Sequence, residues 1–170
     1  TQMGPLCTPA QIDHIETQVA RAVEQGGRIL AGGRRVDGMD GLFFQPTIIE
    51  CPDPSMEIVD TELFGPVLAV LRFSDEDDVI AQANRSVHGL AAGLFTRDSA
   101  RSMRVSRRLR AGIVWVNTYR VISPIAEFGG SKQSGYGRES GMQAVYDYTR
   151  PKTVWMNLSD DPVANPFEPR

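Results

Sequence analysis

Residues 67–117 read VLAVLRFSDEDDVIAQANRSVHGLAAGLFTRDSARSMRVSRRLRAGIVWVN, and the alternation within this stretch decides the fold. Three short apolar runs, Val67–Phe73, Leu90–Phe95 and Ile113–Asn117, are typical of strands buried in a parallel sheet. The segments between them carry helix-start signals and apolar residues at helical spacing. The order strand–helix–strand–helix–strand predicts an α/β fold with an open, mainly parallel sheet and crossover helices.

Each crossover helix has a recognisable start. Ser74, followed by the acidic residues 76–78, predicts the N-cap of the first helix, and Asp98 or Ser99 predicts that of the second. We expect the inward faces to consist of Val79, Ile80 and Ala83 in the first helix and of Met103, Ser106 and Leu109 in the second.

The sequence before this stretch predicts one long helix and two strands. Thr8, Pro9 and Gln11 form a capping signature, and Gly26-Gly27 ends the helix that follows. Beyond it we expect a strand at Arg28–Ala31, a second at Phe43–Ile49, and a short helix or turn at Met56–Leu63.

The sequence after Asn117 predicts a long loop and a projecting end. Residues Thr118–Gly137 read as a glycine-rich loop, and a short helix is expected at Gly141–Tyr148. Lys152–Leu158 alternates like a strand, and the proline-containing tail Ser159–Arg170 should be irregular. The chain therefore divides into a packed domain at residues 1–150 and a C-terminal strand with a tail at residues 151–170.

Composition excludes several functional classes. The chain has 41% hydrophobic and 23% charged residues, which is ordinary for a globular protein, and a net charge of −3, which argues against nucleic-acid binding. It has no apolar run long enough to cross a membrane, so we expect a protein that does not bind membranes. The first residues show no signal-peptide pattern, but the chain does not begin with Met, so the expectation of a cytoplasmic protein rests on its two thiols, which indicate a reducing compartment. Its two cysteines and two histidines are scattered, so no metal site is expected.

Neither cysteine looks reactive. Cys7 lies just before a helix cap and Cys51 precedes a proline in a turn, and no cationic partner is evident for either. We expect both to be inert thiols in a reducing compartment.

Three motifs have both a functional and a purely structural interpretation. In Asp60–Pro66, Glu62 can accept hydrogen bonds from sugar hydroxyls and Phe64 can pack on a ring, but a solvated carboxylate and a core aromatic explain them equally well. Asn117 ends a buried strand, where ligands bind in α/β sheets, or it simply closes a turn. Residues 128–139 lack the spacing of a phosphate loop, so their glycines indicate a loop that passes close to other backbone.

Six motifs in this order resemble the aldehyde dehydrogenase superfamily, over about its last third and from Gln2 to about Val154 of this chain. They are Gln2–Leu6, Phe44–Thr47, Glu62–Pro66, Gly89–Asp98, Gly112–Asn117 and Phe128–Glu139.

The resemblance implies an NAD- or NADP-dependent enzyme that oxidises an aldehyde to a carboxylic acid through a cysteine thioester. It assigns Glu62 to the hydroxyls of the nicotinamide-side ribose and Phe64 to the same end of the cofactor. It assigns Phe128 to the aldehyde pocket, and it places Tyr119 and Ile122 in the loop 118–125 that shapes substrate choice. Many members have an aromatic residue where Ile122 stands, which would give this chain a less bulky wall. Glu139 matches an acid with a structural or proton-relay role.

The resemblance also implies that the central catalytic groups lie outside this chain. The nucleophilic cysteine, the general-base glutamate and the oxyanion asparagine match positions upstream of Thr1, so no catalytic residue is expected here and the isolated chain should be inactive. An alternative is a non-catalytic assembly module, because the matched segment Lys152–Leu158 joins a sheet in a neighbouring subunit and predicts a homo-oligomer. A further alternative, nucleic-acid binding through Arg97, Arg101, Arg104 and Arg108 with Arg107 and Arg110, competes with a solvated helix face.

Overall fold

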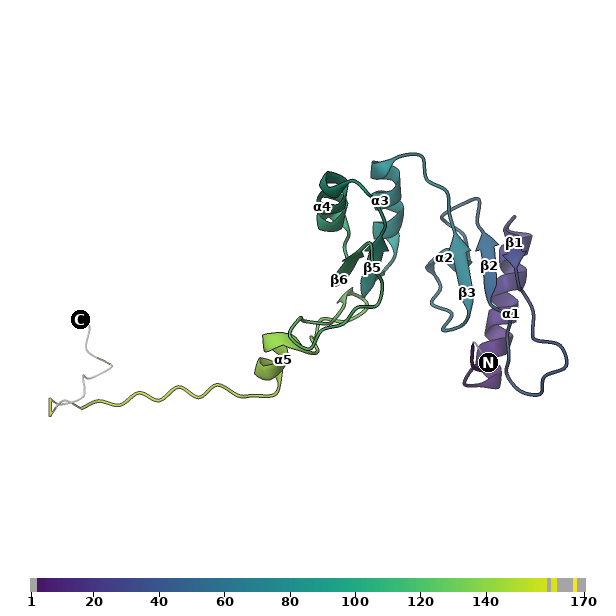
Figure 1. Cartoon of the computed structure of the whole chain (residues 1–170). Helices are drawn as coiled ribbons and strands as arrows, with labels where there is room; N and C mark the ends of the chain where they lie inside the picture. The colour runs from purple at the N-terminus through teal and green to yellow at the C-terminus, as the bar shows by residue number, and fades with distance from the viewer. Residues whose placement is uncertain (1–2, 159, 162–166, 168–170) are drawn as a thin grey trace.

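The computed structural model describes residues 3–158, 160–161 and 167. Its elements are α1 (Pro9–Glu24), β1 (Arg28–Ala31), β2 (Thr47–Glu50), α2 (Glu57–Asp60), β3 (Val67–Val70), α3 (Glu76–Arg85), β4 (His88–Gly89), β5 (Ala91–Leu94), α4 (Ser99–Arg108), β6 (Ile113–Val116), β7 (Ser131–Lys132) and α5 (Gly141–Asp147). Figure 1 shows two bodies, one built from α1 to β3 and one from α3 to α5, followed by an extended C-terminal arm. None of the helices in these ranges is both long enough and apolar enough to cross a membrane.

The described strands form three separate sheets. In the first, β1 is antiparallel to β2 and β2 is parallel to β3. β5 and β6 form a parallel pair joined through α4, while β4 and β7 form an antiparallel pair. One sheet containing all three apolar runs is therefore not confirmed by the described strands, because β3 pairs with β2 and not with β5. Apolar runs report how deeply a strand can be buried, but they do not specify its neighbour.

The first body contains the main hydrophobic core. The capping signature is confirmed: the Thr8 side chain accepts the backbone N–H of Gln11 at 3.2 Å. The Gln11 side chain accepts the N–H of Cys7 at 3.1 Å, one residue earlier than in the usual capping box. The core consists of Ile12, Ile15, Val19, Ala22, Phe44, Ile49, Cys51, Met56, Ile58 and Leu63.

The second body has a thinner core and differs from two details of the prediction. The N-cap of α3 is Asp75 and not Ser74, because the Asp75 carboxylate accepts the N–H of Asp78 while Ser74 donates its own N–H to Asp78. The buried residues of the two helices are Ile80 and Val105, whereas Met103 is 55% exposed and does not face inward as expected. Ala83 is exposed as well, and Ser106 and Leu109 are half-buried.

The strands of the three apolar runs are less buried than their sequences predict. β3 and β5 alternate between half-buried and exposed residues, and Leu68 on β3 is 58% exposed. β6 is half-buried throughout. In this chain, these strands leave exposed the apolar surface that is usually covered on both faces of a parallel sheet.

Ion pairs join α3 to α4. Glu76 accepts hydrogen bonds from Arg104 at 2.6 Å and from Arg101 at 3.3 Å, and Asp77 pairs with Arg108 at 2.6 Å. Three of the arginines considered for nucleic-acid binding are thus partnered by carboxylates. This supports the interpretation of α4 as a solvated, ion-paired helix.

The Glu76 pairs predict an acid-dependent contribution to stability. Hydrogen bonds from Arg104, with smaller effects from Arg101, hold the pKa of Glu76 down at about 2 against an ordinary 4.5. Because the folded-state pKa is depressed, this stabilisation is complete above pH 4.5 and is lost as the pH falls toward 2. We expect the difference in melting temperature between the protein and its Glu76→Gln variant to shrink over that range. For Asp40→Asn, which alters a solvent-exposed carboxylate, the difference should stay constant; equal pH profiles for the two variants would contradict the ion-pair account.

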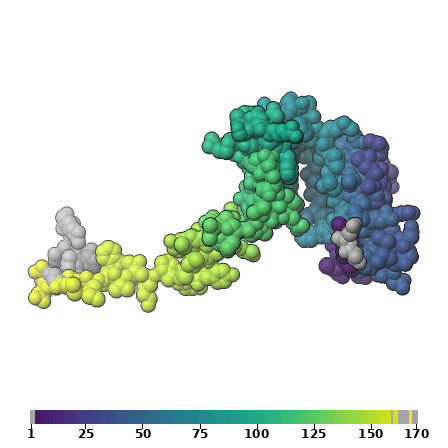
Figure 2. All heavy atoms as spheres, viewed as in Figure 1, coloured from purple at the N-terminus to yellow at the C-terminus, as the bar shows by residue number. Residues whose placement is uncertain are grey.

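The C-terminal arm is extended, but no strand is assigned to it within the described residues. The segment predicted as a strand, Lys152–Leu158, forms no β-ladder with any described residue, and a strand requires such a ladder. It leads away from α5 (Figure 1) and forms a thin projection in the space-filling view (Figure 2). Val154, Trp155, Met156 and Leu158 are 71%, 93%, 75% and 86% exposed. The tail after Leu158 lies largely outside the described residues.

Candidate functional site

The segment Glu62–Pro66 alternates between solvent and core. Leu63 is 9% exposed and belongs to the core cluster, whereas Glu62 and Phe64 on either side of it point outward. Leu63 therefore anchors the segment and fixes which side of it presents the carboxylate and the ring. The structural alternative for Phe64, a core aromatic, is wrong because its side chain is 75% exposed.

The backbone at Phe64 is held in an unfavourable conformation. Its φ of 50° lies in the left-handed region, which is uncommon for a bulky residue. The carbonyl of Phe64 accepts a hydrogen bond from the Gln11 side chain of α1. The next residue, Gly65, lies so close to α1 that an added Cβ would be 2.2 Å from the Cδ1 atom of Ile15. Contacts with α1 thus keep an exposed aromatic ring on strained backbone, and such strain is concentrated at functional sites.

A tight turn after β6 presents Tyr119 and Arg120. Asn117, with φ 55°, uses its side chain to accept the N–H of Thr96 at 2.8 Å and to donate to the Thr96 carbonyl at 2.9 Å. Its amide is therefore committed to closing the turn. The Trp115 indole donates to the carbonyl of Val121 at 2.8 Å, and its ring meets Tyr119 edge-on at 5.4 Å between centroids. These contacts fix the tip of the turn.

The two segments meet in one hollow, which we call the central hollow. Glu62, Phe64, Tyr119 and Arg120 line it together with the start of β3, and it encloses about 540 Å³. Glu62 and Tyr119 lie far apart in the sequence, so only the fold brings them together. Three of the five residues singled out in the sequence, Glu62, Phe64 and Tyr119, therefore share one site.

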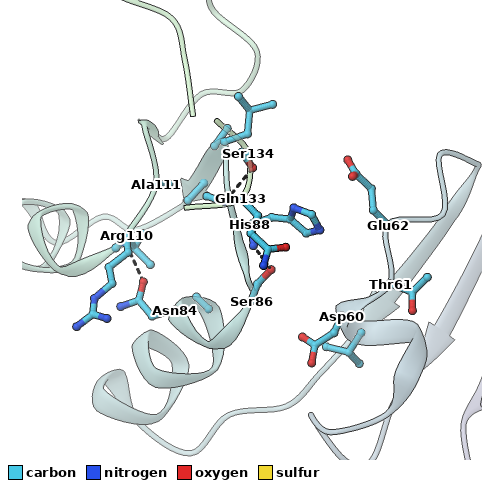
Figure 3. Close-up of a pocket in the computed structure, with 17 residues that line it drawn as sticks. Asp60, Thr61, Glu62, Asn84, Ser86, His88, Arg110, Ala111, Gln133 and Ser134 are labelled. Atoms are coloured by element: carbon cyan, nitrogen blue, oxygen red, sulfur yellow. Dashed lines mark hydrogen bonds between the residues drawn. The ribbon is translucent and has the colours of Figure 1, made fainter. Parts of the chain in front are cut away.

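Glu62 also borders a second hollow, which we call the lateral hollow. It lies between Asp60–Glu62 on one side and β4 with Gln133 and Ser134 on the other (Figure 3). In that view the ring of His88 extends from β4 toward the Asp60–Glu62 segment. Glu62 thus lies between the central hollow and the lateral hollow, where a bound molecule can reach its carboxylate.

The residues of the central hollow suit a nucleotide sugar and a ring. The carboxylate of Glu62 is solvent-exposed and has no hydrogen-bonding or ionic partner within the described ranges. It can accept hydrogen bonds from two hydroxyl groups. The exposed Phe64 ring offers an apolar face two residues away. The carboxylate acceptor and the apolar ring therefore fit a sugar and an adjacent ring such as those of NAD or NADP.

Phe128 and Ile122 lie elsewhere. Phe128 borders a different hollow with the glycine-rich loop and Tyr148, and its backbone exchanges two 2.7 Å hydrogen bonds with Glu139. Glu139 therefore positions Phe128 through its backbone. Ile122 is 63% exposed and lies outside both the central hollow and the Phe128 hollow.

Neither the cysteines nor the potential metal ligands form a second reactive site among the described residues. Cys51 is buried, and burial raises the pKa of its thiol, which disfavours the reactive thiolate. Cys7 is exposed and free. No cluster of three or more potential metal ligands exists among the described residues.

Two residues of the site were not identified from the sequence. Gln11 was interpreted only as part of a helix cap, and no local pattern indicates its bond to a carbonyl 53 residues away. Arg120 directly follows Tyr119, and this position next to a predicted site residue was the signal in the sequence that could have identified it. Its positive φ of 60° and its place in the central hollow become apparent only in three dimensions.

Comparison with known proteins relates the chain to one protein family. A model of the aldehyde dehydrogenase family matches residues 1–154. (Z)-2-((N-methylformamido)methylene)-5-hydroxybutyrolactone dehydrogenase of Acinetobacter baylyi is 49% identical over 168 residues, covering 98% of this chain and 34% of that protein. Betaine aldehyde dehydrogenase 1 of Rhizobium meliloti is 42% identical over 170 residues, again covering 98% and 34%. The chain spans about a third of the length of these relatives.

Solved structures match over the same extent. PnpE of Pseudomonas sp. WBC-3 has a TM-score of 0.91 at 39% identity, covering 98% of this chain and 34% of that chain, and it has also been solved with nicotinamide adenine dinucleotide. A double mutant of betaine aldehyde dehydrogenase from Staphylococcus aureus, solved with NAD+, has a TM-score of 0.91 at 38% identity, covering 99% and 34%.

Proposed function

Because the chain belongs to the aldehyde dehydrogenase family, we propose that it forms the C-terminal part of an NAD(P)-dependent enzyme that oxidises an aldehyde to a carboxylic acid. The overall reaction consumes the aldehyde, NAD(P)+ and water and yields the acid, NAD(P)H and a proton. The nucleophilic cysteine, the general base and the oxyanion asparagine come from polypeptide upstream of Thr1. The chain alone is inactive.

One observation carries this proposal: Glu62 and Phe64 line the same hollow as Tyr119. Hydride transfer requires the nicotinamide ring and the aldehyde carbon to lie next to each other. Residues assigned to the cofactor and a residue assigned to substrate choice are brought together by the fold from distant parts of the sequence. An assembly module would not need this convergence.

The residues of this chain bind and orient the cofactor and the substrate. The Glu62 carboxylate accepts hydrogen bonds from the ribose hydroxyls, and Phe64 packs against the nicotinamide end. NAD(P)+ supplies the hydride acceptor when it is bound. Tyr119, Ile122 and Phe128 shape the substrate side. The upstream polypeptide covers the exposed strands β3 and β5 and completes an open, mainly parallel sheet.

The names of the relatives indicate the class of substrate, and the chain itself indicates the compartment and the assembly. Their names specify a hydroxybutyrolactone derivative and betaine aldehyde, which differ in charge and shape, so the proposal extends to an aldehyde as a class. We place the reaction in the cytoplasm, in line with two unpaired thiols. The exposed arm Lys152–Leu158 pairs with a sheet of another subunit and makes the enzyme a homo-oligomer.

Replacing Glu62 by glutamine in the full-length gene product tests the cofactor assignment. Hydrogen bonds to a charged acceptor contribute about 1.5–3 kcal/mol, so we expect the KM for NAD(P)+ to rise by roughly tenfold or more. The measurement is NAD(P)H formation with a panel of aldehydes. Glu24→Gln is the control, because Glu24 is an exposed carboxylate at the end of α1, away from both hollows.

The same assay can refute the proposal. If the full-length wild type forms no NAD(P)H with any aldehyde, the dehydrogenase activity is wrong. If Glu62→Gln and Glu24→Gln behave alike, the activity stands but Glu62 does not bind the cofactor. Activity of residues 1–170 alone would show that the catalytic groups are not upstream.

A further inference from the structure

Arg120 differs from most arginines of this chain. Nine arginines among the described residues pair with carboxylates, at distances from 2.5 to 3.3 Å, as the ion pairs of Arg28 and Arg101 illustrate. Arg120 is exposed, lines the central hollow and makes no ion pair within the described part of the chain. A cation without a counter-ion at the edge of a binding hollow is available to a ligand.

The turn that carries Arg120 is built to present it. Its φ of 60° places the residue in the left-handed region, and Asn117 three residues earlier is in the same region. Such backbone is energetically unfavourable and persists only where the surrounding contacts hold it. The bonds from Asn117 to Thr96 and from Trp115 to Val121 supply that hold without using the Arg120 side chain.

The guanidinium group is supported on one side and free on the others. It lies 5.9 Å from the ring centroid of Tyr119, in a cation–π arrangement. Stacking on an aromatic face leaves the N–H groups in the guanidinium plane available for bidentate hydrogen bonds. A planar fork of this kind matches a carboxylate group.

The central hollow is lined by two residues of opposite charge. Glu62 places a negative charge on the cofactor side, and Arg120 places a positive charge on the side of the substrate loop. An anionic group is repelled by the first and attracted by the second, so the pair orients a substrate whose carboxylate is remote from its aldehyde carbon. A cationic substrate encounters the opposite arrangement.

We infer that Arg120 determines substrate specificity and that the preferred substrates are aldehydes carrying a carboxylate at the far end of a short chain. This inference rests on the proposed function and specifies its substrate class. The reaction is unchanged, since Arg120 binds the distal carboxylate and takes no part in hydride transfer.

The test compares three aldehydes of different charge on the full-length gene product: 4-oxobutanoate, butanal and betaine aldehyde. We expect kcat/KM to be highest for 4-oxobutanoate and lowest for betaine aldehyde. Arg120→Gln should lower kcat/KM for 4-oxobutanoate roughly tenfold while changing that for butanal little, since a charge-assisted hydrogen bond is lost in one case only. Arg120→Lys should retain part of the preference, and Arg120→Glu should shift it toward betaine aldehyde.

Controls separate this inference from the proposed function. Arg107→Gln removes an exposed charge from α4 outside the central hollow, and it should leave all three values unchanged. Calorimetric titration with succinate should show weaker binding to Arg120→Gln than to the wild type. No activity with any aldehyde would refute the proposed function. Activity without a charge preference, or an Arg120→Gln effect confined to the KM for NAD(P)+, would overturn the role of Arg120 and leave the dehydrogenase function standing.

Discussion

Replacing Gly112 by alanine is expected to destabilise the protein by about 3 kcal/mol or more, because the new methyl group has no space. A Cβ atom at Gly112 would lie 1.8 Å from the carbonyl oxygen of Gly129 and 2.8 Å from its carbonyl carbon. Both are backbone atoms, so no side-chain rotation relieves the clash. Gly112 directly precedes β6 and donates its N–H to the carbonyl of Gly89 in β4 at 3.0 Å, so the strain would also disturb the entry into the β5–β6 pair.

Gly137→Ala is the matched control for this effect. An added Cβ at Gly137 meets nothing within 4 Å, and its φ is not positive. Alanine at such a position leaves stability unchanged or raises it by about 0.4–1 kcal/mol. Thermal unfolding and soluble yield of the two variants should therefore diverge sharply. Equal melting temperatures would show that Gly129 does not pack closely against Gly112.

Ending the chain after Arg150 is expected to weaken self-association of the full-length protein, so that a smaller assembly or a monomer results. The deleted segment carries Val154, Trp155, Met156 and Leu158, which are 71% to 93% exposed in this chain. Exposed apolar side chains of this size mark interaction surfaces, and burying each fully contributes about 1.5–3 kcal/mol. The mass measured by light scattering should fall to that of a smaller assembly or a monomer.

A deletion that ends the chain after Leu158 serves as the control. It removes the proline-containing tail and retains the apolar arm, so the assembly should keep its mass. If both truncations keep the native mass, the arm is not the association element. If both lose it, the tail after Leu158 contributes as well.

The sequence predicted the elements better than their arrangement. The helix start at Thr8 follows from local capping and was confirmed, and of the two starts left open for α4, Asp98 or Ser99, the structure has Asp98 as the N-cap. The start of α3 was placed one residue early because Ser74 and Asp75 are both good caps, and only the geometry shows that Asp75 accepts the N–H of Asp78. Pairing between strands depends on contacts distant in sequence, so the separation of β3 from β5 was not predictable from apolar runs.

The sequence predicted those site residues whose chemical type alone indicates a role. Glu62 and Phe64 were singled out as a carboxylate beside an aromatic, and the structure shows both pointing outward around a buried Leu63. The close approach of the loop 128–139 to other backbone was expected from its glycines and is confirmed at Gly129. The roles of Gln11 and Arg120 depend on contacts and strain that the sequence alone does not reveal.

A crystal structure of the full-length gene product with bound NAD(P)+ tests the central claim most directly. We expect a carboxylate oxygen of Glu62 to lie about 3 Å from the hydroxyl oxygens of the nicotinamide-side ribose. Phe64 should then contact the nicotinamide end, with the Tyr119–Arg120 turn across the hollow from it. A cofactor bound elsewhere, with Glu62 facing solvent, would contradict the account.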